Sequence, residues 1–432
     1  MNYEGSLAYL RSLSVFGSQL GLRRIARLME LLGNPQTRYR TVHVTGTNGK
    51  GSVSAMLASI LTQSGLRTGR YISPHLLSYT ERIAIDGLDI APQDFADMIA
   101  IVSTFATQVK EETGDSPTEF EILTAAAFLY FAKKEVDYAV IEVGLGGLLD
   151  STNVIVPEIS IITNVTMEHA QQCGGTLEGI AHHKAGIIKD GVPVVTAATG
   201  VPLDILRETA QEKNADLFVL GEDFGVDCLS FSHTGQKLSF RSMILGLSGE
   251  AYEIRLLGKY QAQNSALAIM AAHILGQTNV DITVETTRKG LALASWPGRF
   301  ELFEKDGKTI IVDGAHNPDG MRALRESLDT YFPVEGRVFL LGILKDKAIV
   351  PMLQTLLQPQ DRVITTSPNS DRAADAQFVA EEAQKITAQV VAASDREEAL
   401  ARALSMTREG EILCIAGSLY LIGELRRDLS KS

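Results

Sequence analysis

Residues 42–52 read VHVTGTNGKGS and decide the first fold prediction. An apolar β-branched run leads through three glycines into a segment in which apolar residues recur at helical spacing as far as Leu61. Glycines let backbone N–H groups approach a phosphate, and a helix N-terminus adds a favourable dipole. Lys50 would supply charge to the outer phosphates and Ser52 a hydroxyl oxygen to Mg²⁺. The stretch therefore predicts a nucleotide-binding loop between a strand and a helix.

The loop departs from the common GxxxxGK[ST] spacing. Val44 stands at the position of the first glycine, and Gly51 separates Lys50 from Ser52. A glycine-rich turn with an exposed lysine is the alternative, but three glycines, a lysine and a serine in this context favour nucleotide binding. His43, inside the strand, is interpreted as a packed side chain without a role.

Short apolar runs, polar turns and helical segments alternate on both sides of this loop, which predicts open parallel sheets. Thr118 and Glu121 have the spacing of a capping box for a helix that runs to about Lys134. Short alternating runs from Asp216 to Leu257 predict a small antiparallel insertion. The strands predicted in this half are Thr41 to Val44, Tyr138 to Val143, Ile159 to Val165 and Val192 to Thr196.

A Pro/Gly break, ASWPGR at residues 294–299, separates two patterned halves. Because 432 residues exceed what one hydrophobic core usually organises, we expect two α/β domains, 1–296 and 297–432. In the second, Asn317-Pro318 is expected to open a helix. Its predicted strands are Thr309 to Val312, Val338 to Leu344, Arg362 to Thr366, Gln389 to Ala392 and Ile412 to Ala416.

The composition excludes several classes of protein. A net charge of −12 argues against nucleic-acid binding, since phosphate contacts need a basic surface. Cys173, Cys228 and Cys414 share no metal-ligand spacing and are interpreted as reduced thiols. No stretch approaches the roughly 20 apolar residues of a membrane span. We therefore expect a cytoplasmic protein with neither nucleic-acid nor membrane partners.

Further polar residues follow the predicted strands. Glu142 ends an apolar strand, where an acid beside a phosphate loop holds Mg²⁺; a solvated strand end is the alternative. Glu168 and His169 follow the next strand, and His169 is either a metal ligand or an ordinary loop histidine. Lys184 lies in a mostly apolar helical run, and the residues alone favour a lysine that reaches the surface over one with a lowered pKa.

Ten motifs run through nearly the whole chain: GTNGKGS at Gly46, YISPHL at Tyr71, ERI at Glu81, EVGLGG with DSTN from Glu142, EH at Glu168, HKAGIIK at His183, QAQN at Gln261, WPGRFE at Trp296, VDGAHNPDG at Val312 and GSLY at Gly417. In this order they resemble the folylpolyglutamate synthase family, the folate branch of the Mur ligase superfamily. Each motif is weak alone, but ten in sequence are specific. The resemblance implies a P-loop ATPase-like N-terminal domain with a parallel sheet, followed by a Rossmann-like C-terminal ligase domain.

The resemblance also implies ligands for particular residues. The implied ligands of Mg²⁺ are Ser52, Glu142 and His169. The sequence does not decide whether a monovalent cation is also required. Lys184 matches the family lysine that is carbamylated, which would turn a cation near the metals into an anion and so replaces the surface-lysine interpretation. The residues that match the triphosphate site are Thr47, Asn48, Gly49, Lys50, Gly51 and Ser52.

Other motif residues take their roles from the same resemblance. Asn264 matches the adenine-contacting position, and Arg299 and Asp313 match further ATP contacts. By the same resemblance, the catalytic residues are Lys50, Lys184 and His316, and His316 would belong to the site between the domains. The folate-side loop corresponds to Ser73, Pro74, His75 and Arg82, of which Ser73 matches best.

The implied enzyme is an ATP-dependent ligase that adds L-glutamate to the γ-carboxylate of a folate through an acyl phosphate, acting as a monomer. One alternative is dihydrofolate synthase, which joins glutamate to dihydropteroate, alone or as a second activity. Another is a nucleotide-binding module that has lost ligation. Leu148 replaces the family's arginine and Glu168 its aspartate. The loss of the arginine bears on substrate choice more than on catalysis, whereas the glutamate keeps the charge and moves it by one methylene.

Overall fold

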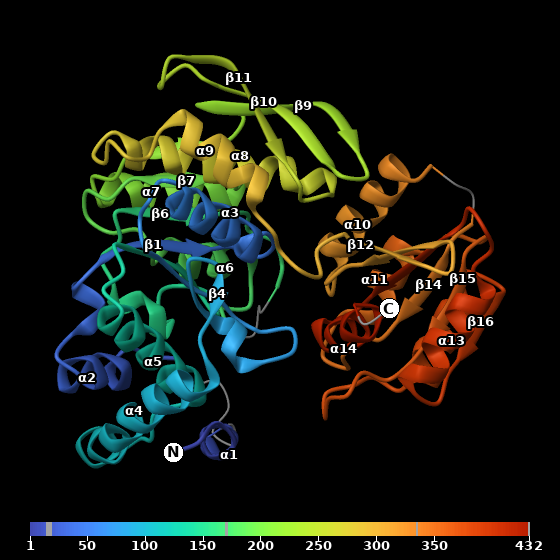
Figure 1. The fold of residues 1–432 in the computed structure, drawn as a ribbon, viewed down its shortest axis with the longest axis horizontal. Helices are drawn as coiled ribbons and strands as arrows, with labels where there is room; N and C mark the ends of the chain where they lie inside the picture. Colours follow the sequence, from blue (N-terminus) through green and yellow to red (C-terminus); the bar gives the residue numbers. More distant parts are fainter. Residues whose placement is uncertain (14–19, 169–171, 334–335, 431–432) are drawn as a thin grey trace. The chain divides into compact units, whose positions relative to one another are not determined.

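The computed structural model describes residues 1–13, 20–168, 172–333 and 336–430, and the chain divides into two compact units, both of α/β type (Figure 1). The predicted fold class is therefore confirmed. Each unit is discontinuous in sequence, whereas the sequence prediction used contiguous ranges. Unit 1 comprises Met1–Asp227, Ser239–Glu253 and Gln263–Ala294, and unit 2 comprises Cys228–Leu238, Ile254–Ala262 and Ser295–Ser432.

Unit 1 is built on an eight-stranded sheet, within the described residues, in the order β4-β3-β2-β5-β1-β6-β7-β8. All neighbours from β2 to β8 pair in parallel, whereas β2–β3 and β3–β4 are antiparallel. The predicted parallel sheet is thus confirmed, and β3 and β4 add an antiparallel edge that was not predicted. The strands are β1 (Arg40–Thr45), β2 (Thr68–Tyr71), β3 (Ile83–Ile85), β4 (Leu88–Asp89), β5 (Tyr138–Glu142), β6 (Ile159–Ile162), β7 (Val194–Thr196) and β8 (Leu217–Val219).

The antiparallel edge has a local cause in the sequence. Asp86 and Gly87 join β3 to β4 and have φ of 51° and 80°. Both values lie in the left-handed region that a two-residue hairpin turn requires, and Asp-Gly is a favoured pair for it. The first β-strand of the region predicted as an antiparallel insertion, β8, instead joins the parallel edge of this sheet.

Helices cover both faces of the large sheet. Figure 1 shows α3, α8 and α9 on one side and α2, α4 and α5 on the other. The capping box at α5 is confirmed, since the Thr118 side chain and the Glu121 backbone and side chain bond reciprocally. The helices are α1 (Tyr3–Leu13), α2 (Arg23–Leu31), α3 (Lys50–Gln63), α4 (Pro92–Thr113), α5 (Glu119–Lys133), α6 (Leu177–Ala185), α7 (Val201–Glu212), α8 (Lys259–Gly276) and α9 (Val284–Leu293), with 3₁₀ turns η2 (Pro35–Thr37), η3 (Tyr79–Arg82) and η4 (Ser151–Val154).

Side-chain alternation along β5 separates the core from the site. Ala139 and Ile141 belong to the apolar cluster formed with α4 and α5, which includes Phe95 and Phe128. Glu142, one residue on, therefore points to the opposite face, where α3 packs on β5. The sheet thus directs one carboxylate out of an apolar strand toward the helix that follows the phosphate loop.

A small antiparallel sheet, β11-β10-β9, confirms the predicted insertion: β9 (Phe224–Ser232), β10 (Gly235–Ser242) and β11 (Leu247–Ile254). As far as its residues are described, unit 2 is built on a six-stranded sheet in the order β12-β13-β17-β14-β15-β16, parallel except for the β12–β13 hairpin. A second Asp-Gly turn, Asp306-Gly307, makes that hairpin. The strands are β12 (Glu301–Lys305), β13 (Lys308–Val312), β14 (Val338–Leu341), β15 (Arg362–Thr365), β16 (Gln389–Ala392) and β17 (Ile412–Ala416).

The helices of unit 2 follow its parallel strands. Asn317 caps α10 as expected, because its side chain accepts a hydrogen bond from the Gly320 amide. They are α10 (Pro318–Tyr331), α11 (Ile349–Leu356), α12 (Ala376–Gln384), α13 (Arg396–Met406) and α14 (Leu419–Leu429). Among the described helices of the whole chain, none combines the length and apolar character needed to cross a membrane.

Candidate active site

The loop at Gly46 connects β1 to α3 at the carboxyl edge of the large sheet. Gly49 precedes α3 with a φ of 90° and no side-chain cap. The first-turn amides of a helix lack intrahelical acceptors and carry the positive end of its dipole, so they suit a phosphate. Lys50 Nζ donates to the carbonyl oxygens of Gly46, at 2.9 Å, and Thr47, at 3.1 Å, which keeps the amine over the loop.

Two glycines of the loop are required by close approach as well as by φ. A Cβ on Gly46 would lie 1.8 Å from Thr163 Oγ1, and one on Gly49 would lie 2.4 Å from Asn264 Oδ1. Both positions also have φ in the range that favours glycine, 150° and 90°. The structure thus places Asn264, which α8 carries, directly against the phosphate loop.

The residues after β6 also contact the loop, and the sequence analysis missed them. Asn48 N donates to Asn164 Oδ1 at 2.8 Å, and Thr163 Oγ1 donates to Asn48 O at 2.6 Å. The predicted strand Ile159 to Val165 ends at Ile162, because Thr163 and Asn164 turn to the loop. A Thr-Asn pair directly after a strand that neighbours a phosphate loop was the available signal.

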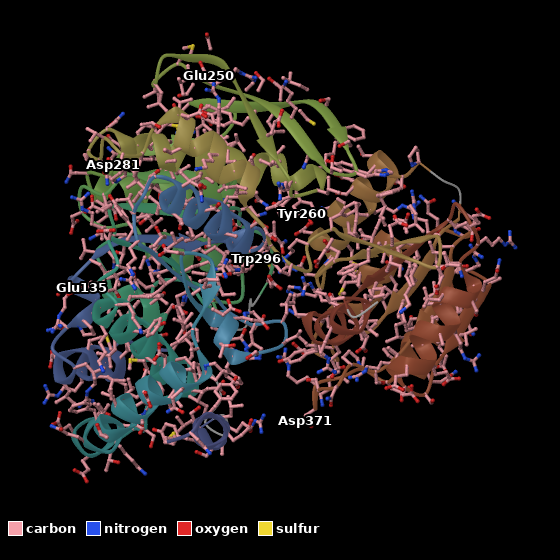
Figure 2. All side chains as sticks on the ribbon, in the orientation of Figure 1. Glu135, Glu250, Tyr260, Asp281, Trp296 and Asp371 are labelled. Carbon is pink, nitrogen blue, oxygen red and sulfur yellow. The ribbon has the colours of Figure 1, made fainter. Side chains whose placement is uncertain are left out.

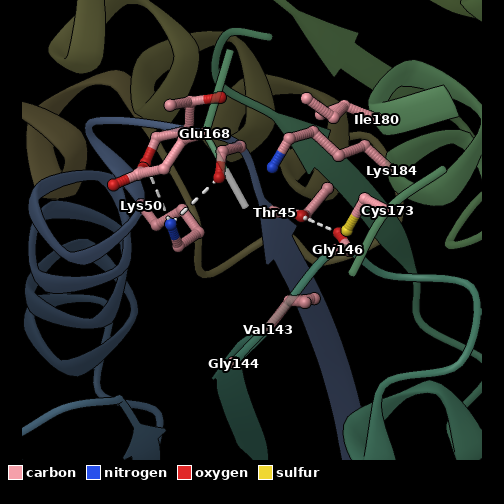
Figure 3. A pocket seen from close by; sticks show the side chains of 11 residues that line it. Thr45, Lys50, Val143, Gly144, Gly146, Glu168, Cys173, Ile180 and Lys184 are labelled. Carbon is pink, nitrogen blue, oxygen red and sulfur yellow. Dashed lines mark hydrogen bonds between the residues drawn. The ribbon is translucent and has the colours of Figure 1, made fainter. Parts of the chain in front are cut away.

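A pocket opens beside the loop, and Figure 3 shows Lys50, Glu168 and Lys184 at its wall. Lys184 is 6% exposed. Its burial, with the nearby charge of Lys50, lowers its pKa to about 7, although Cys173 and Glu168 act in the opposite direction. The lining residues are Thr45, Gly46, Thr47, Lys50, Val143, Gly144, Gly146, Glu168, Cys173, Ile180 and Lys184.

The predicted Mg²⁺ ligands are only partly described. Ser52 lies in the first turn of α3 and is 2% exposed, and Glu142 ends β5 and is 5% exposed. His169 lies outside the described residues. Within those residues, no group of three or more His, Cys, Asp or Glu could hold a metal. One hydroxyl and one carboxylate still fit Mg²⁺, because it is commonly bound through one or two carboxylates together with substrate phosphates.

The segment between Gly144 and Asn153 is held by a buried hydrogen-bond chain. Asp150 accepts from Leu145 N at 2.8 Å and from Thr152 Oγ1 at 2.6 Å, and Thr152 Oγ1 lies 2.9 Å from His43 Nε2. Burial lowers the pKa of His43 to about 3, with a smaller effect from Lys189, so its ring is neutral. His43, given no role from the sequence, therefore helps fix a segment that lines the pocket.

The segment predicted to contact the folate forms a compact polar and aromatic cluster. Arg82 Nε donates to His75 Nδ1 at 2.9 Å, and the guanidinium lies 5.0 Å from the centroid of the Tyr79 ring. Burial, with the charge of Arg82, lowers the pKa of His75 to about 3. The Ser73–Pro74 peptide that leads into this loop is cis. The structure therefore joins Arg82 to the consecutive predicted substrate residues Ser73, Pro74 and His75 through its hydrogen bond with His75.

The remaining predicted residues belong to unit 2. Asp313 is buried and accepts hydrogen bonds from Phe300 N at 2.8 Å, Tyr260 Oη at 3.0 Å and Ala315 N at 2.8 Å (Tyr260 is labelled in Figure 2). Burial raises the pKa of Asp313, while the charge of Arg299 opposes this shift. His316 Nδ1 lies 2.7 Å from Gly314 O. Asp313 thus fixes the backbone at Phe300 and Ala315 through its hydrogen bonds.

Two family models match the chain: the Mur ligase middle domain over residues 44–272 and the Mur ligase glutamate ligase domain over residues 298–419. A phosphate loop at the edge of a parallel sheet, followed by this second domain, defines an ATP-dependent ligase of the Mur type. Among curated relatives, the chain is 37% identical to folylpolyglutamate synthase of Lacticaseibacillus casei and 34% identical to dihydrofolate synthase/folylpolyglutamate synthase of Bacillus subtilis, each over 99% of both chains. The chain belongs to the folylpolyglutamate synthase/dihydrofolate synthase family.

A solved structure agrees with this assignment. Mycobacterium tuberculosis folylpolyglutamate synthase complexed with ADP and AMPPCP superposes with a TM-score of 0.90 and 31% sequence identity, and the alignment covers 100% of both chains. The expected family and two-domain Mur ligase architecture are therefore confirmed. The nucleotide that this chain binds is ATP.

Proposed function

We propose that the chain adds L-glutamate to the γ-carboxylate of a reduced folate at the expense of ATP. The observation that carries the proposal is the pocket in which Lys50 of the phosphate loop meets Lys184 and Glu168. We further propose residues 1–296 as the ATP-binding domain and residues 297–432 as the C-terminal ligase domain, acting in a monomer. The proposed site residues are those named from the family motifs, His169, Arg299, Asp313 and His316 included.

The first chemical step needs positioning and charge neutralisation more than a nucleophilic side chain. A carboxylate oxygen of the folate attacks the γ-phosphorus of ATP, and ADP leaves. Lys50 and the first-turn amides of α3 neutralise charge on the transferred group. Ser52 and Glu142, with His169, would hold Mg²⁺, which supplies Lewis-acid stabilisation of the phosphoryl oxygens.

In the second step the glutamate amine attacks the acyl carbon, and inorganic phosphate leaves with the former carboxylate oxygen. One proton passes from the amine to the departing phosphate as the amide forms. Water must be kept from the acyl phosphate, which it would hydrolyse. The pocket supports this requirement because apolar side chains, including Val143 and Ile180, line it beside the polar groups.

Lys184 is proposed to react with carbon dioxide and carry a carbamate. Carbamate formation needs a neutral amine, and a pKa of about 7 makes that form abundant at neutral pH. The modification replaces a buried cation with an anion, which suits a site whose other cation, Lys50, lies nearby.

Dihydrofolate synthase is the second candidate function, since the relative from Bacillus subtilis carries both names. Purified protein incubated with ATP, L-glutamate and either tetrahydrofolate or dihydropteroate distinguishes them by mass spectrometry of the products. Diglutamylated folate from tetrahydrofolate monoglutamate supports the proposal. Product from dihydropteroate alone would overturn it, and ATP binding without any glutamylated product would leave a nucleotide-binding module.

A further inference from the structure

Thr163 and Asn164, the first two residues after β6, hold the phosphate loop through hydrogen bonds. Thr163 Oγ1 donates to the carbonyl oxygen of Asn48 at 2.6 Å. In return, the Asn164 side chain accepts the Asn48 amide at 2.8 Å, and the Asn164 carbonyl accepts the Thr47 amide at 2.9 Å. Three hydrogen bonds thus join one dipeptide to the other, and they use both backbone amides in the middle of the loop.

Thr47 and Thr166 add two further hydrogen bonds. Thr47 Oγ1 donates to Thr166 O at 3.2 Å and accepts from Thr166 N at 3.0 Å. Because the Thr47 and Asn48 amides donate to Asn164, we assign these two predicted triphosphate residues an anchoring role and leave the phosphate to amides further along the loop. The first turn of α3, which begins at Lys50, presents backbone amides at the positive end of the helix dipole. The predicted triphosphate loop therefore divides into an anchor half and a binding half.

We propose that Thr163 and Asn164 are positioning residues for the nucleotide: they hold Thr47 and Asn48 so that Lys50 and the α3 amides converge on the phosphates. The proposal rests on the ATP site of the proposed function. Neither residue needs to touch ATP. The fit of the loop to Thr163 is tight, because a Cβ on Gly46 would lie 1.8 Å from Thr163 Oγ1.

The energetic reason is preorganisation. Without the hydrogen bonds from Thr163 and Asn164, the glycine-rich loop would become ordered only when the nucleotide binds. The entropy lost in that ordering would weaken the affinity for the nucleotide. A hydrogen bond of ordinary strength corresponds to a change of roughly threefold to tenfold in a binding constant. Loss of one of these contacts should therefore weaken phosphate binding by that factor, while the sheet itself stays folded.

The test compares Thr163→Val, which keeps the shape but removes the hydroxyl, with Thr163→Ser, which keeps the hydroxyl. Asn164→Ala removes the acceptor of the Asn48 amide. Thr196→Val is the matched control, because Thr196 is also a buried threonine on this sheet, and its Oγ1 donates to Ile162 O at 2.8 Å without contacting the loop. ADP affinity is measured by titration calorimetry, with KM values for ATP and for the folate substrate from steady-state assays.

Thr163→Val and Asn164→Ala should each weaken ADP binding and raise the KM for ATP by roughly threefold to tenfold, with the KM for the folate substrate unchanged. Thr163→Ser and Thr196→Val should bind ADP like the unaltered chain. Wild-type ADP affinity in Thr163→Val and Asn164→Ala, or an equal loss in Thr196→Val, would overturn the positioning role.

If Asn164→Ala does not fold, the comparison of ADP affinity between Thr163→Val and Thr163→Ser is sufficient to test the proposal. Failure of the unaltered chain to bind ADP would instead overturn the proposed function, so the two failures are distinguishable.

Discussion

Lys184 and Lys50 line the same pocket, and the charge of Lys50 adds to burial in lowering the pKa of Lys184 to about 7. A buried lysine 6% exposed is therefore partly neutral at physiological pH. Glu168 lines the same pocket, but its charge offsets burial and the charge of Lys50 only in part, and a further anion at the two lysines would be favourable. The pair thus supports both the nucleotide site and a modified Lys184.

We expect Lys184→Met to lose activity and yet to gain stability below about pH 7. The depressed folded-state pKa means that burial of charged Lys184 destabilises the protein fully at pH below the folded value. Its penalty disappears as pH rises from about 7 toward the ordinary value of 10.5. Thermal unfolding at pH 6 and pH 9 checks the sign: a Met variant that is less stable than the unaltered chain at pH 6 would contradict it.

Removal of carbon dioxide should lower activity if Lys184 is carbamylated. Activity measured in CO₂-depleted buffer should recover when bicarbonate is added, and mass spectrometry after trapping should find the added carboxyl group on Lys184. Formate or acetate should partly restore Lys184→Ala, because a small carboxylate can replace the lost anion. Full activity of Lys184→Ala without any additive would exclude the carbamate.

Gly49→Ala should abolish ADP binding while the protein stays folded. Its Cβ would meet Asn264 Oδ1 at 2.4 Å in a left-handed conformation, so the loop would have to move from the position in which its amides face the phosphates. Gly65→Ala is the control, since Gly65 has a φ of 80° but no atom within 4 Å of the added Cβ. Gly65→Ala should lose only about 1 kcal/mol of stability, and equal ADP binding by both variants would contradict the loop geometry.

Arg82→Met should raise the KM for the folate substrate by about tenfold and leave the KM for ATP unchanged. Arg82 donates to His75 and lies over the Tyr79 ring, so its loss would release the predicted substrate loop. Steady-state kinetics with each substrate varied separately measures the two constants. A parallel rise of both would assign Arg82 to general stability instead.

Unit 2 contains a buried charge network whose disruption should destabilise it. Asp361 is fully buried, pairs with Arg325 at 3.1 Å and accepts the Arg337 amide at 3.0 Å. Asp361→Ala would leave Arg325 without this partner, and we expect a loss of about 3–5 kcal/mol in the free energy of unfolding by urea. Lys385→Ala, which breaks an exposed pair with Glu382, should cost less than about 1 kcal/mol.

Much of the fold could be predicted from local patterns. The strand Gln389 to Ala392 and the capping box at Thr118 agree with the structure because a short β-branched apolar run and cap chemistry are local properties. Both antiparallel edges were missed, although both Asp-Gly turns stand in the sequence. In unit 1, β4 has only two residues, which is too short for an alternating pattern. In unit 2, β13 was predicted but its partner β12 was not. Helices α1, α2 and α4 were also not predicted.

The site could be predicted where a motif carries it and not where tertiary contacts do. Lys50 and Glu142 were identified from their places after a strand and at a strand end. Thr163 and Asn164 were read as part of a strand, because their role depends on the adjacent position of β1 and β6 in the sheet. Likewise, the lowered pKa of Lys184 arises from burial and from Lys50, which is distant in sequence.

Isotope transfer from the folate carboxylate to phosphate tests the central claim most directly. Folate substrate labelled with ¹⁸O in its γ-carboxylate is incubated with the protein, ATP and L-glutamate, and the released phosphate is examined by mass spectrometry. Carboxylate attack on ATP predicts that each phosphate carries one oxygen from the substrate. Unlabelled phosphate, formed together with the glutamylated product, would contradict activation through an acyl phosphate.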